Sequence, residues 1–171
     1  MKDFQKDYYT GVKGIYFYRI LKAIIEIGNL DKRNVKILDY GCGNGKLKKI
    51  LGNKVTGFDI LKKLTEIDDW HKVKFGVVVA NEVFYLMPPE EIIRFLGAVK
   101  QLNPNSLLIV GTSRYSILNK IAKTLAGQHD AHNGMLTTPS MELATIENSM
   151  KLINYKVVWG MCDVRLFKFK P

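Results

Sequence analysis

The stretch from Ile37 to Leu47, ILDYGCGNGKL, constrains the fold more strongly than any other part of this chain. It begins with the apolar residues of a buried strand. Three glycines follow at alternate positions and permit a tight turn with close backbone approach: Gly41, Gly43 and Gly45. Residues 46–51 then predict a short helix. A strand, a glycine-rich turn and a helix N-terminus together form the nucleotide-binding crevice of an open α/β sheet.

The glycine spacing distinguishes between two classes of ligand that use this architecture. The dinucleotide fingerprint is G-x-G-x-x-G, whereas this loop is G-x-G-x-G with Asp39 two residues ahead of it. An acid at that position suits a cationic amine better than a pyrophosphate. The stretch resembles the first motif of class I S-adenosylmethionine-dependent methyltransferases, and the resemblance implies cofactor contacts at Asp39, Gly41, Cys42, Gly43 and Gly45. Taken alone, the glycines are also compatible with a purely structural turn.

A second acid closes the next predicted strand. Residues 54–59, KVTGFD, end in Asp59, eighteen residues beyond Gly41. An acid in this place can accept hydrogen bonds from a ribose diol. The resemblance implies that Asp59 holds the ribose hydroxyls of S-adenosylmethionine and that Ile60 packs against the adenine. The alternative for Asp59 is an ordinary turn former at the end of a strand.

The third landmark is an apolar run at residues 77–80, short enough for a central parallel strand. Asn81 and Glu82 follow it directly. This arrangement resembles the fourth methyltransferase strand in the version common among small-molecule enzymes, and differs from the N-P-P-Y sequence of many enzymes that methylate nucleic acid bases. The resemblance implies a cofactor contact at Asn81. Glu82 is a catalytic candidate, with a solvated or helix-capping carboxylate as the equal alternative.

The chain between the second and third of these strands is unusually short. Only seventeen residues separate Asp59 from Val77, whereas the family fits a helix, a third strand and an acid-bearing loop there, and a parallel crossover alone needs about a dozen residues. Either residues 61–70 form one compact helix and the third strand is lost, or residues 64–68 keep a stub of that strand. Asp68 or Asp69 then supplies the adenine contact, unless both are only surface carboxylates.

The remaining pattern fits one Rossmann-like domain spanning residues 1–171. Apolar periodicity and end signals predict further elements at residues 16–27, 88–102, 107–110, 138–153, 156–161 and 164–170. The resemblance implies an α/β three-layer sandwich around a mostly parallel seven-stranded sheet, with the third strand missing or shortened and an antiparallel pair at one edge. The turn between the last two strands is expected near Asp163. Trp70 is expected in the core or in a lid.

Composition limits the class of protein. The chain has 171 residues, of which 47% are hydrophobic, and no apolar run approaches the ~20 residues that span a bilayer. Two cysteines are too few for a disulfide framework, and the first nine residues are too polar for a signal peptide, so a cytoplasmic location is expected. The net charge of +10 indicates a lysine-rich surface and also permits RNA as a partner.

Residues for the methyl acceptor must come from what the cofactor fold leaves over. These are the first nine residues with Tyr8 and Tyr9, the loop after Asn81, and residues 113–138. His129 and His132 are proton-acceptor candidates because histidine titrates near neutral pH, with exposed loop histidines as the alternative. No complete set of metal ligands is visible. We therefore expect methyl transfer from S-adenosylmethionine to a small-molecule or lipid-like acceptor; the alternatives are RNA or protein methylation, a non-catalytic S-adenosylmethionine-binding module and, more remotely, an NAD-dependent oxidoreductase.

Overall fold

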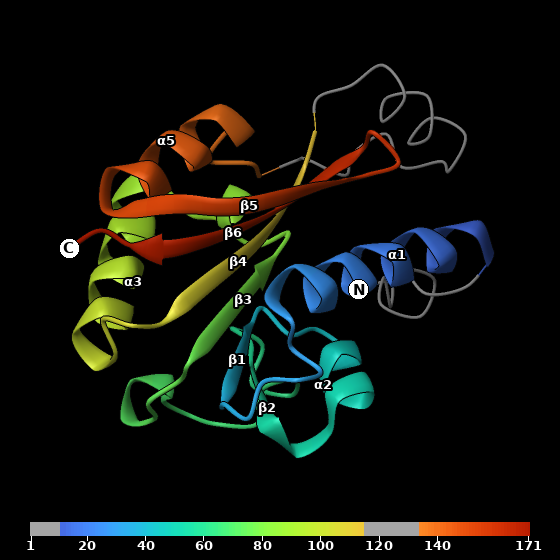
Figure 1. Ribbon diagram of the computed structural model, residues 1–171, viewed down its shortest axis with the longest axis horizontal. Coiled ribbons are helices and arrows are strands. Elements are labelled where there is room, and N and C mark those ends of the chain that lie inside the picture. The colour runs from blue at the N-terminus through green and yellow to red at the C-terminus, as the bar shows by residue number, and fades with distance from the viewer. Residues whose placement is uncertain (1–10, 115–133) are drawn as a thin grey trace.

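A computed structural model describes residues 11–114 and 134–171 (Figure 1). The helices and strands run in this order: α1 (Gly11–Gly28), β1 (Ile37–Tyr40), α2 (Lys46–Leu51), β2 (Val55–Phe58), β3 (Val77–Asn81), α3 (Pro89–Leu102), β4 (Leu107–Ser113), α5 (Pro139–Ser149), β5 (Met150–Val158) and β6 (Cys162–Phe169). Three short 3-10 helices stand between them: η1 (Gly52–Lys54), η2 (Trp70–Lys72) and η3 (Phe84–Leu86). Within these described ranges, every helix is too short or too polar to cross a bilayer.

The described residues form one six-stranded sheet with the order β2-β1-β3-β4-β6-β5. The first four strands of this order are parallel, while β6 and β5 are antiparallel. Asp39 on β1 lies opposite both Gly57 on β2 and Val79 on β3, so the carboxyl ends of these strands meet at one edge. The parallel sheet with an antiparallel pair at its edge is confirmed, with six described strands in place of the expected seven.

Helices cover both faces of the sheet, as Figure 1 shows, with α1 and α2 on one side and α3 and α5 on the other. Successive strand residues point to opposite faces, which explains why the central strands are apolar throughout. On β3, Val77 and Val79 pack against the α1 side, whereas Val78 and Ala80 pack against the α3 side. The protein therefore has one hydrophobic core on each face of the sheet, and the sheet and the helices on its two sides form a three-layer sandwich.

The short segment between β2 and β3 lacks the third strand, as the first of the two expected arrangements supposed, but it does not form the compact helix of that arrangement. It is a loop through residue 69 followed by η2, without the compact helix over residues 61–70 or the strand stub over residues 64–68. Glu66 takes the place of a neighbouring strand, because its N–H donates to the Gly57 carbonyl (2.9 Å) and its carboxylate accepts from the Gly57 N–H (3.1 Å). Lys48 on α2 donates to the same carboxylate oxygen at 2.7 Å. The N–H and C=O groups of Gly57, which face away from the sheet on this edge strand, therefore both form hydrogen bonds with Glu66.

Several further boundaries differ from the sequence expectations: α1 begins at Gly11 and not at residue 16, and β4 continues to Ser113. The helix expected over residues 138–153 ends at Ser149, because Met150 pairs with Phe169 and begins β5. The turn expected near Asp163 lies at residues 159–161, and Asp163 itself is on β6. Trp70 is in the core as expected, with 5% of its surface exposed and its ring 5.2 Å from that of Phe95.

Candidate active site

The glycine loop between β1 and α2 has the backbone that only glycine adopts without strain. Gly41, Gly43 and Gly45 have φ values of 76°, 49° and 63°, which place all three in the left-handed region. A Cβ added to Gly43 or Gly45 would meet no atom within 4 Å, so the loop borders open space. A Cβ on Gly41 would lie 2.3 Å from Cγ2 of Val83, which packs against the loop from the end of β3.

Asp39 places a buried carboxylate beside this loop. Its side chain is at the end of β1, 7% exposed, and accepts no hydrogen bond from any described residue. Burial is the main cause that raises the pKa of Asp39 to about 7, and the negative charges of Asp59 and Glu66 contribute to the same rise. A buried acid without a donor is costly, and a cationic ligand group removes that cost. The carboxylate and the open glycine loop therefore fit the amino-acid end of S-adenosylmethionine.

Asp59 is fixed directly after β2 by two backbone hydrogen bonds. Its Oδ2 accepts from the Gly43 N–H at 3.0 Å, and its Oδ1 accepts from the Leu61 N–H at 3.0 Å. The carboxylate therefore lies against the glycine loop, as a ribose-binding acid requires. Ile60, next to it, is 91% exposed, so its side chain is available to a ligand. Asp68 is exposed on the loop that follows.

Two other predicted cofactor residues turn their side chains toward protein. The Cys42 thiol lies 3.4 Å from the Leu64 carbonyl oxygen, and its backbone N–H donates to Phe58. Burial raises the pKa of the Cys42 thiol to about 12, so it is a poor nucleophile. Asn81 packs its buried Oδ1 close to Gly111, where it accepts no hydrogen bond within the described part of the chain.

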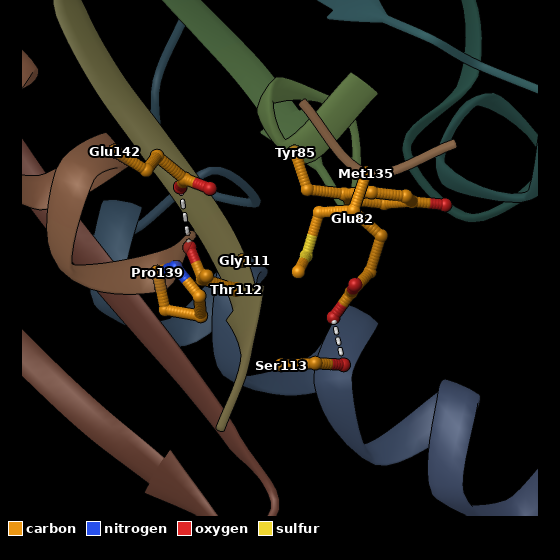
Figure 2. Close-up of a pocket in the computed structure, with 8 residues that line it drawn as sticks. All are labelled: Glu82, Tyr85, Gly111, Thr112, Ser113, Met135, Pro139 and Glu142. Atoms are coloured by element: carbon orange, nitrogen blue, oxygen red, sulfur yellow. Dashed lines mark hydrogen bonds between the residues drawn. The ribbon is translucent and has the colours of Figure 1, made fainter. Parts of the chain in front are cut away.

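A pocket lies beyond the carboxyl ends of β3 and β4, against the start of α5 (Figure 2). We call it the β3–β4 pocket; its lining residues are Glu82, Tyr85, Gly111, Thr112, Ser113, Met135, Pro139 and Glu142. Its enclosed volume is small, about 10 Å³, which is roughly the room of one water molecule. Glu82 has a φ of 56°, a strained value for a residue other than glycine. The Ser113 hydroxyl donates a hydrogen bond to the Glu82 carboxylate at 2.7 Å.

Hydrogen bonds hold residues 135–138 across one side of this pocket. The N–H groups of Leu136 and Thr137 donate to the Tyr85 carbonyl at 2.8 and 3.2 Å. The Thr137 hydroxyl donates to the Met87 carbonyl at 2.5 Å. Thr138 then caps α5 through the Met141 N–H, as the sequence predicted. The start of α5 is thereby fixed with Glu142 facing the pocket.

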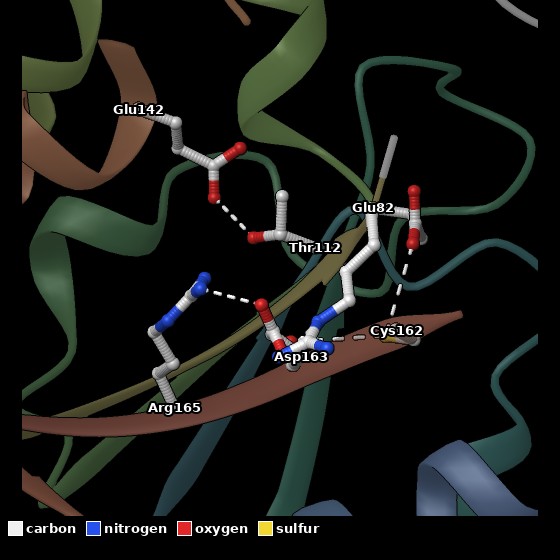
Figure 3. Close-up of polar contacts among 7 residues, drawn as sticks. Glu82, Thr112, Glu142, Cys162, Asp163 and Arg165 are labelled. Carbon is white, nitrogen blue, oxygen red and sulfur yellow. Dashed lines mark hydrogen bonds and ion pairs between the residues drawn. The ribbon is translucent and has the colours of Figure 1, made fainter. Parts of the chain in front are cut away.

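Glu142 is a buried acid that accepts a hydrogen bond from the Thr112 hydroxyl at 2.5 Å. The pKa of Glu142 is raised to about 7, mainly by burial and to a smaller extent by the Glu82 carboxylate, while Thr112 and Arg165 act in the lowering direction. Nearby on β6, Asp163 pairs with Arg165 at 2.5 Å, as Figure 3 shows. Asp163 also pairs with Arg114 at 2.7 Å. Arg114 and Arg165 therefore share the carboxylate of Asp163.

The sequence predicted the acids beside the glycine loop but not all of the acids that the structure brings near them or into the β3–β4 pocket. Glu66 and Glu142 were both missed. Glu142 precedes Ile146 by four residues, so helical spacing on one face was the available signal for its burial. The remaining catalytic candidates, Tyr8, Tyr9, His129 and His132, lie outside the described residues. Within the described residues, no group of three potential ligands could hold a metal ion.

Comparisons with known proteins agree with this geometry. A model of the methyltransferase domain family matches residues 12–158. A protein of Pyrococcus horikoshii OT3 is similar in structure, with 14% identity, a TM-score of 0.68, and coverage of 99% of this chain and 100% of that one. The N-methyltransferase NodS of Bradyrhizobium japonicum WM9 is 12% identical with a TM-score of 0.66, covering 91% and 97% of the two chains.

A third similar structure is magnesium protoporphyrin IX methyltransferase of Synechocystis PCC 6803, crystallised with bound S-adenosylhomocysteine. It is 14% identical, with a TM-score of 0.59 and coverage of 99% of this chain and 100% of that one. At identities this low, the likeness concerns the fold. No curated protein matches this chain in sequence.

Proposed function

This chain belongs to the methyltransferase domain family, whose enzymes use S-adenosylmethionine, and on this premise we propose that it methylates a small molecule bound in the β3–β4 pocket. One observation carries the proposal. Two adjacent residues at the end of β3 belong to the two parts of the site, since Val83 packs on the glycine loop while Glu82 lines the pocket. A donor over the loop and an acceptor in the pocket would therefore be neighbours.

The roles we assign on the donor side follow from the contacts of the loop. Asp39 binds the amino group of the methyl donor, because it is a buried carboxylate without a donor of its own among the described residues. Asp59 binds the ribose hydroxyls from beside Gly43. When bound, the donor supplies a methyl group on a sulfonium. The protein then needs chiefly to position the acceptor, and positioning alone can contribute about 7–11 kcal/mol.

The charge of the pocket supports a small molecule over RNA. Two carboxylates line it, from Glu82 and Glu142, and no described lysine or arginine does. Although the chain carries a net charge of +10, phosphates near this pocket would meet like charges. Met135, from the segment over residues 135–138, also lines it. The similar Synechocystis enzyme, by its description, acts on a small molecule, a magnesium porphyrin.

The test is to follow a tritiated methyl group from S-adenosylmethionine into a cell extract and to separate small molecules, RNA and protein afterwards. We expect the label in the small-molecule fraction. Ser113→Ala removes the hydroxyl that orients Glu82 and should lower transfer without changing affinity for S-adenosylhomocysteine. Label that appears chiefly in RNA or protein, or a Ser113→Ala variant that transfers at the original rate, would refute this assignment.

A further inference from the structure

We infer that Tyr16 and Asn81 complete the donor side of the site: Asn81 accepts a hydrogen bond from the amino group of the methyl donor, and Tyr16 donates one to its carboxylate. This inference rests on the proposed function, because it extends the donor site assigned to Asp39. Two atoms carry it. In the part of the chain that the structure describes, the Tyr16 hydroxyl oxygen and Asn81 Oδ1 are the fully buried side-chain nitrogen or oxygen atoms that form no hydrogen bond.

Tyr16 lies on α1, and its ring is held by two other aromatic rings. The centroid of the Tyr16 ring is 5.9 Å from that of Trp159 and 5.5 Å from that of Phe17. Burial raises the pKa of the Tyr16 phenol well above its usual range, and the nearby Cys162 and Glu82 act in the same direction. The hydroxyl therefore keeps its proton and is a hydrogen-bond donor. A buried O–H without an acceptor is costly, and a ligand oxygen removes that cost.

Asn81 presents the complementary group on the same face of the sheet. On β3, Val77 and Val79 pack into the core under α1, so Asn81, two residues further on, points to that side. Its Oδ1 lies over β4, because a Cβ added to Gly111 would be 2.1 Å from this oxygen. A carboxamide oxygen only accepts hydrogen bonds. Asn81 Oδ1 therefore requires an N–H or O–H from a ligand.

The strand order arranges the polar groups in a row along the carboxyl edge of the sheet. Asp59 follows β2 and Asp39 is on β1, where it alternates with core residues and also points to the α1 side. Asn81 ends β3, and Tyr16 lies near Cys162 on β6. A methyl donor whose ribose is held by Asp59 therefore extends its other end toward Asn81 and Tyr16.

An α-amino acid group matches these atoms, because it carries N–H donors and carboxylate acceptors on one carbon. Asp39 and Asn81 both present acceptor oxygens, so they suit the ammonium. The Tyr16 hydroxyl suits the carboxylate, and a hydrogen bond to a charged group is stronger than one between neutral groups. The nearby Ser113 hydroxyl is already occupied, because it donates to Glu82. The methyl donor carries such an amino acid group at the end opposite its adenine.

Binding of three probes tests the inference without turnover. S-adenosylhomocysteine carries the ammonium and the carboxylate, its decarboxylated analogue keeps only the ammonium, and 5′-methylthioadenosine has neither. We expect calorimetry to show that Tyr16→Phe weakens S-adenosylhomocysteine binding roughly tenfold or more, because a hydrogen bond to a charged group is lost. Binding of the other two probes should change less than about threefold, because neither presents an acceptor to Tyr16.

The same variant should have the opposite effect on the ligand-free protein. Phenylalanine keeps the ring and removes the buried O–H, so the midpoint of urea unfolding should rise. A gain in stability combined with a loss of affinity distinguishes a ligand-binding hydroxyl from a structural one, whose removal leaves the affinity unchanged. Tyr18→Phe is the matched control, because Tyr18 is exposed on the same helix. It should change neither the midpoint nor the affinity.

For Asn81, we expect Asn81→Ala to weaken S-adenosylhomocysteine and its decarboxylated analogue alike, since both carry the ammonium. Unchanged affinity for these two probes overturns the role of Asn81. An unchanged S-adenosylhomocysteine affinity in Tyr16→Phe, or an equal loss for all three probes, overturns the role of Tyr16. In the unaltered protein, a decarboxylated analogue that binds as tightly as S-adenosylhomocysteine does so too, whether or not the variants fold. These outcomes leave the proposed function standing, whereas failure of the unaltered protein to bind S-adenosylhomocysteine would remove both.

Discussion

Gly41 offers a sharp test of how the cofactor loop and the acceptor side are joined. Replacing it with alanine adds one carbon at a φ of 76°, and that carbon would lie 2.3 Å from Cγ2 of Val83. The left-handed conformation costs a residue with a side chain about 1–2 kcal/mol. Forcing an extra carbon into packed space costs about 1–3 kcal/mol. We expect Gly41→Ala to lower the free energy of unfolding by about 2–5 kcal/mol, out of the ~5–15 kcal/mol typical of a domain.

Gly43→Ala is the matched control. Its φ of 49° is also left-handed, but an added Cβ there meets no atom within 4 Å, so only the conformational cost of about 1–2 kcal/mol applies. The difference between the two variants therefore isolates the contact with Val83. Val83→Ala removes the clashing methyl groups, so a double-mutant cycle with Gly41→Ala should recover most of that difference.

The assay is urea unfolding of the ligand-free protein, with the midpoint and slope fitted for each variant. Working without ligand matters, because both glycines border the proposed donor site. Equal loss of stability for Gly41→Ala and Gly43→Ala would refute the close approach of Val83 to the loop. So would a double variant no more stable than Gly41→Ala alone.

Three further predictions concern the acids around the loop. The raised pKa of Asp39 means that the folded state disfavours the ionised carboxylate. As the pH rises from about 4 to about 7, the free energy of unfolding of the ligand-free protein should therefore fall relative to that of Asp39→Asn. Parallel pH profiles for the two proteins would contradict this. Glu66→Ala should lower the free energy of unfolding in urea by about 0.5–1.5 kcal/mol, because the hydrogen bond to Gly57 is lost. Lys48→Ala should lower it by less, because its ion pair with Glu66 is exposed. A larger loss for Lys48→Ala would contradict the role of Glu66 as the hydrogen-bond partner of the edge strand. Asp59→Ala should weaken S-adenosylmethionine and S-adenosylhomocysteine equally, by about 1.5–3 kcal/mol per hydrogen bond to the charged group, as measured by calorimetry; a loss for only one ligand would exclude a ribose role.

Local signals in the sequence were enough to predict the glycine loop and the two acids that lie beside it. The glycines of the loop are required by the backbone itself, since all three have positive φ, and this requirement is visible at a single position. The acids at the ends of β1 and β2 follow directly from the strands that carry them. Asp39 and Asp59 therefore come together as soon as the two strands pair in parallel.

The features that the sequence did not reveal depend on contacts between distant residues. Glu66 forms hydrogen bonds with the backbone of Gly57, nine residues earlier in the sequence. Nothing in the residues around Glu66 indicates that it binds the edge strand of the sheet. Glu142 is buried because α5 packs against α3 and β5, and its hydrogen-bond partner Thr112 on β4 is thirty residues away in the sequence. A carboxylate is expected at the surface by default, so only the tertiary arrangement shows that this one lines a pocket.

The hydrogen bonds between Glu66 and the edge strand β2 matter for the solubility of a sheet that lacks its third strand, and for the design of small enzymes. An edge strand with open N–H and C=O groups invites pairing with other molecules and hence aggregation. In this protein β2 has four residues, and its central outward groups are occupied from within the chain. A designer who trims the third strand from a larger methyltransferase would need to place one carboxylate where it reaches the exposed strand, together with a lysine on the preceding helix to hold it there.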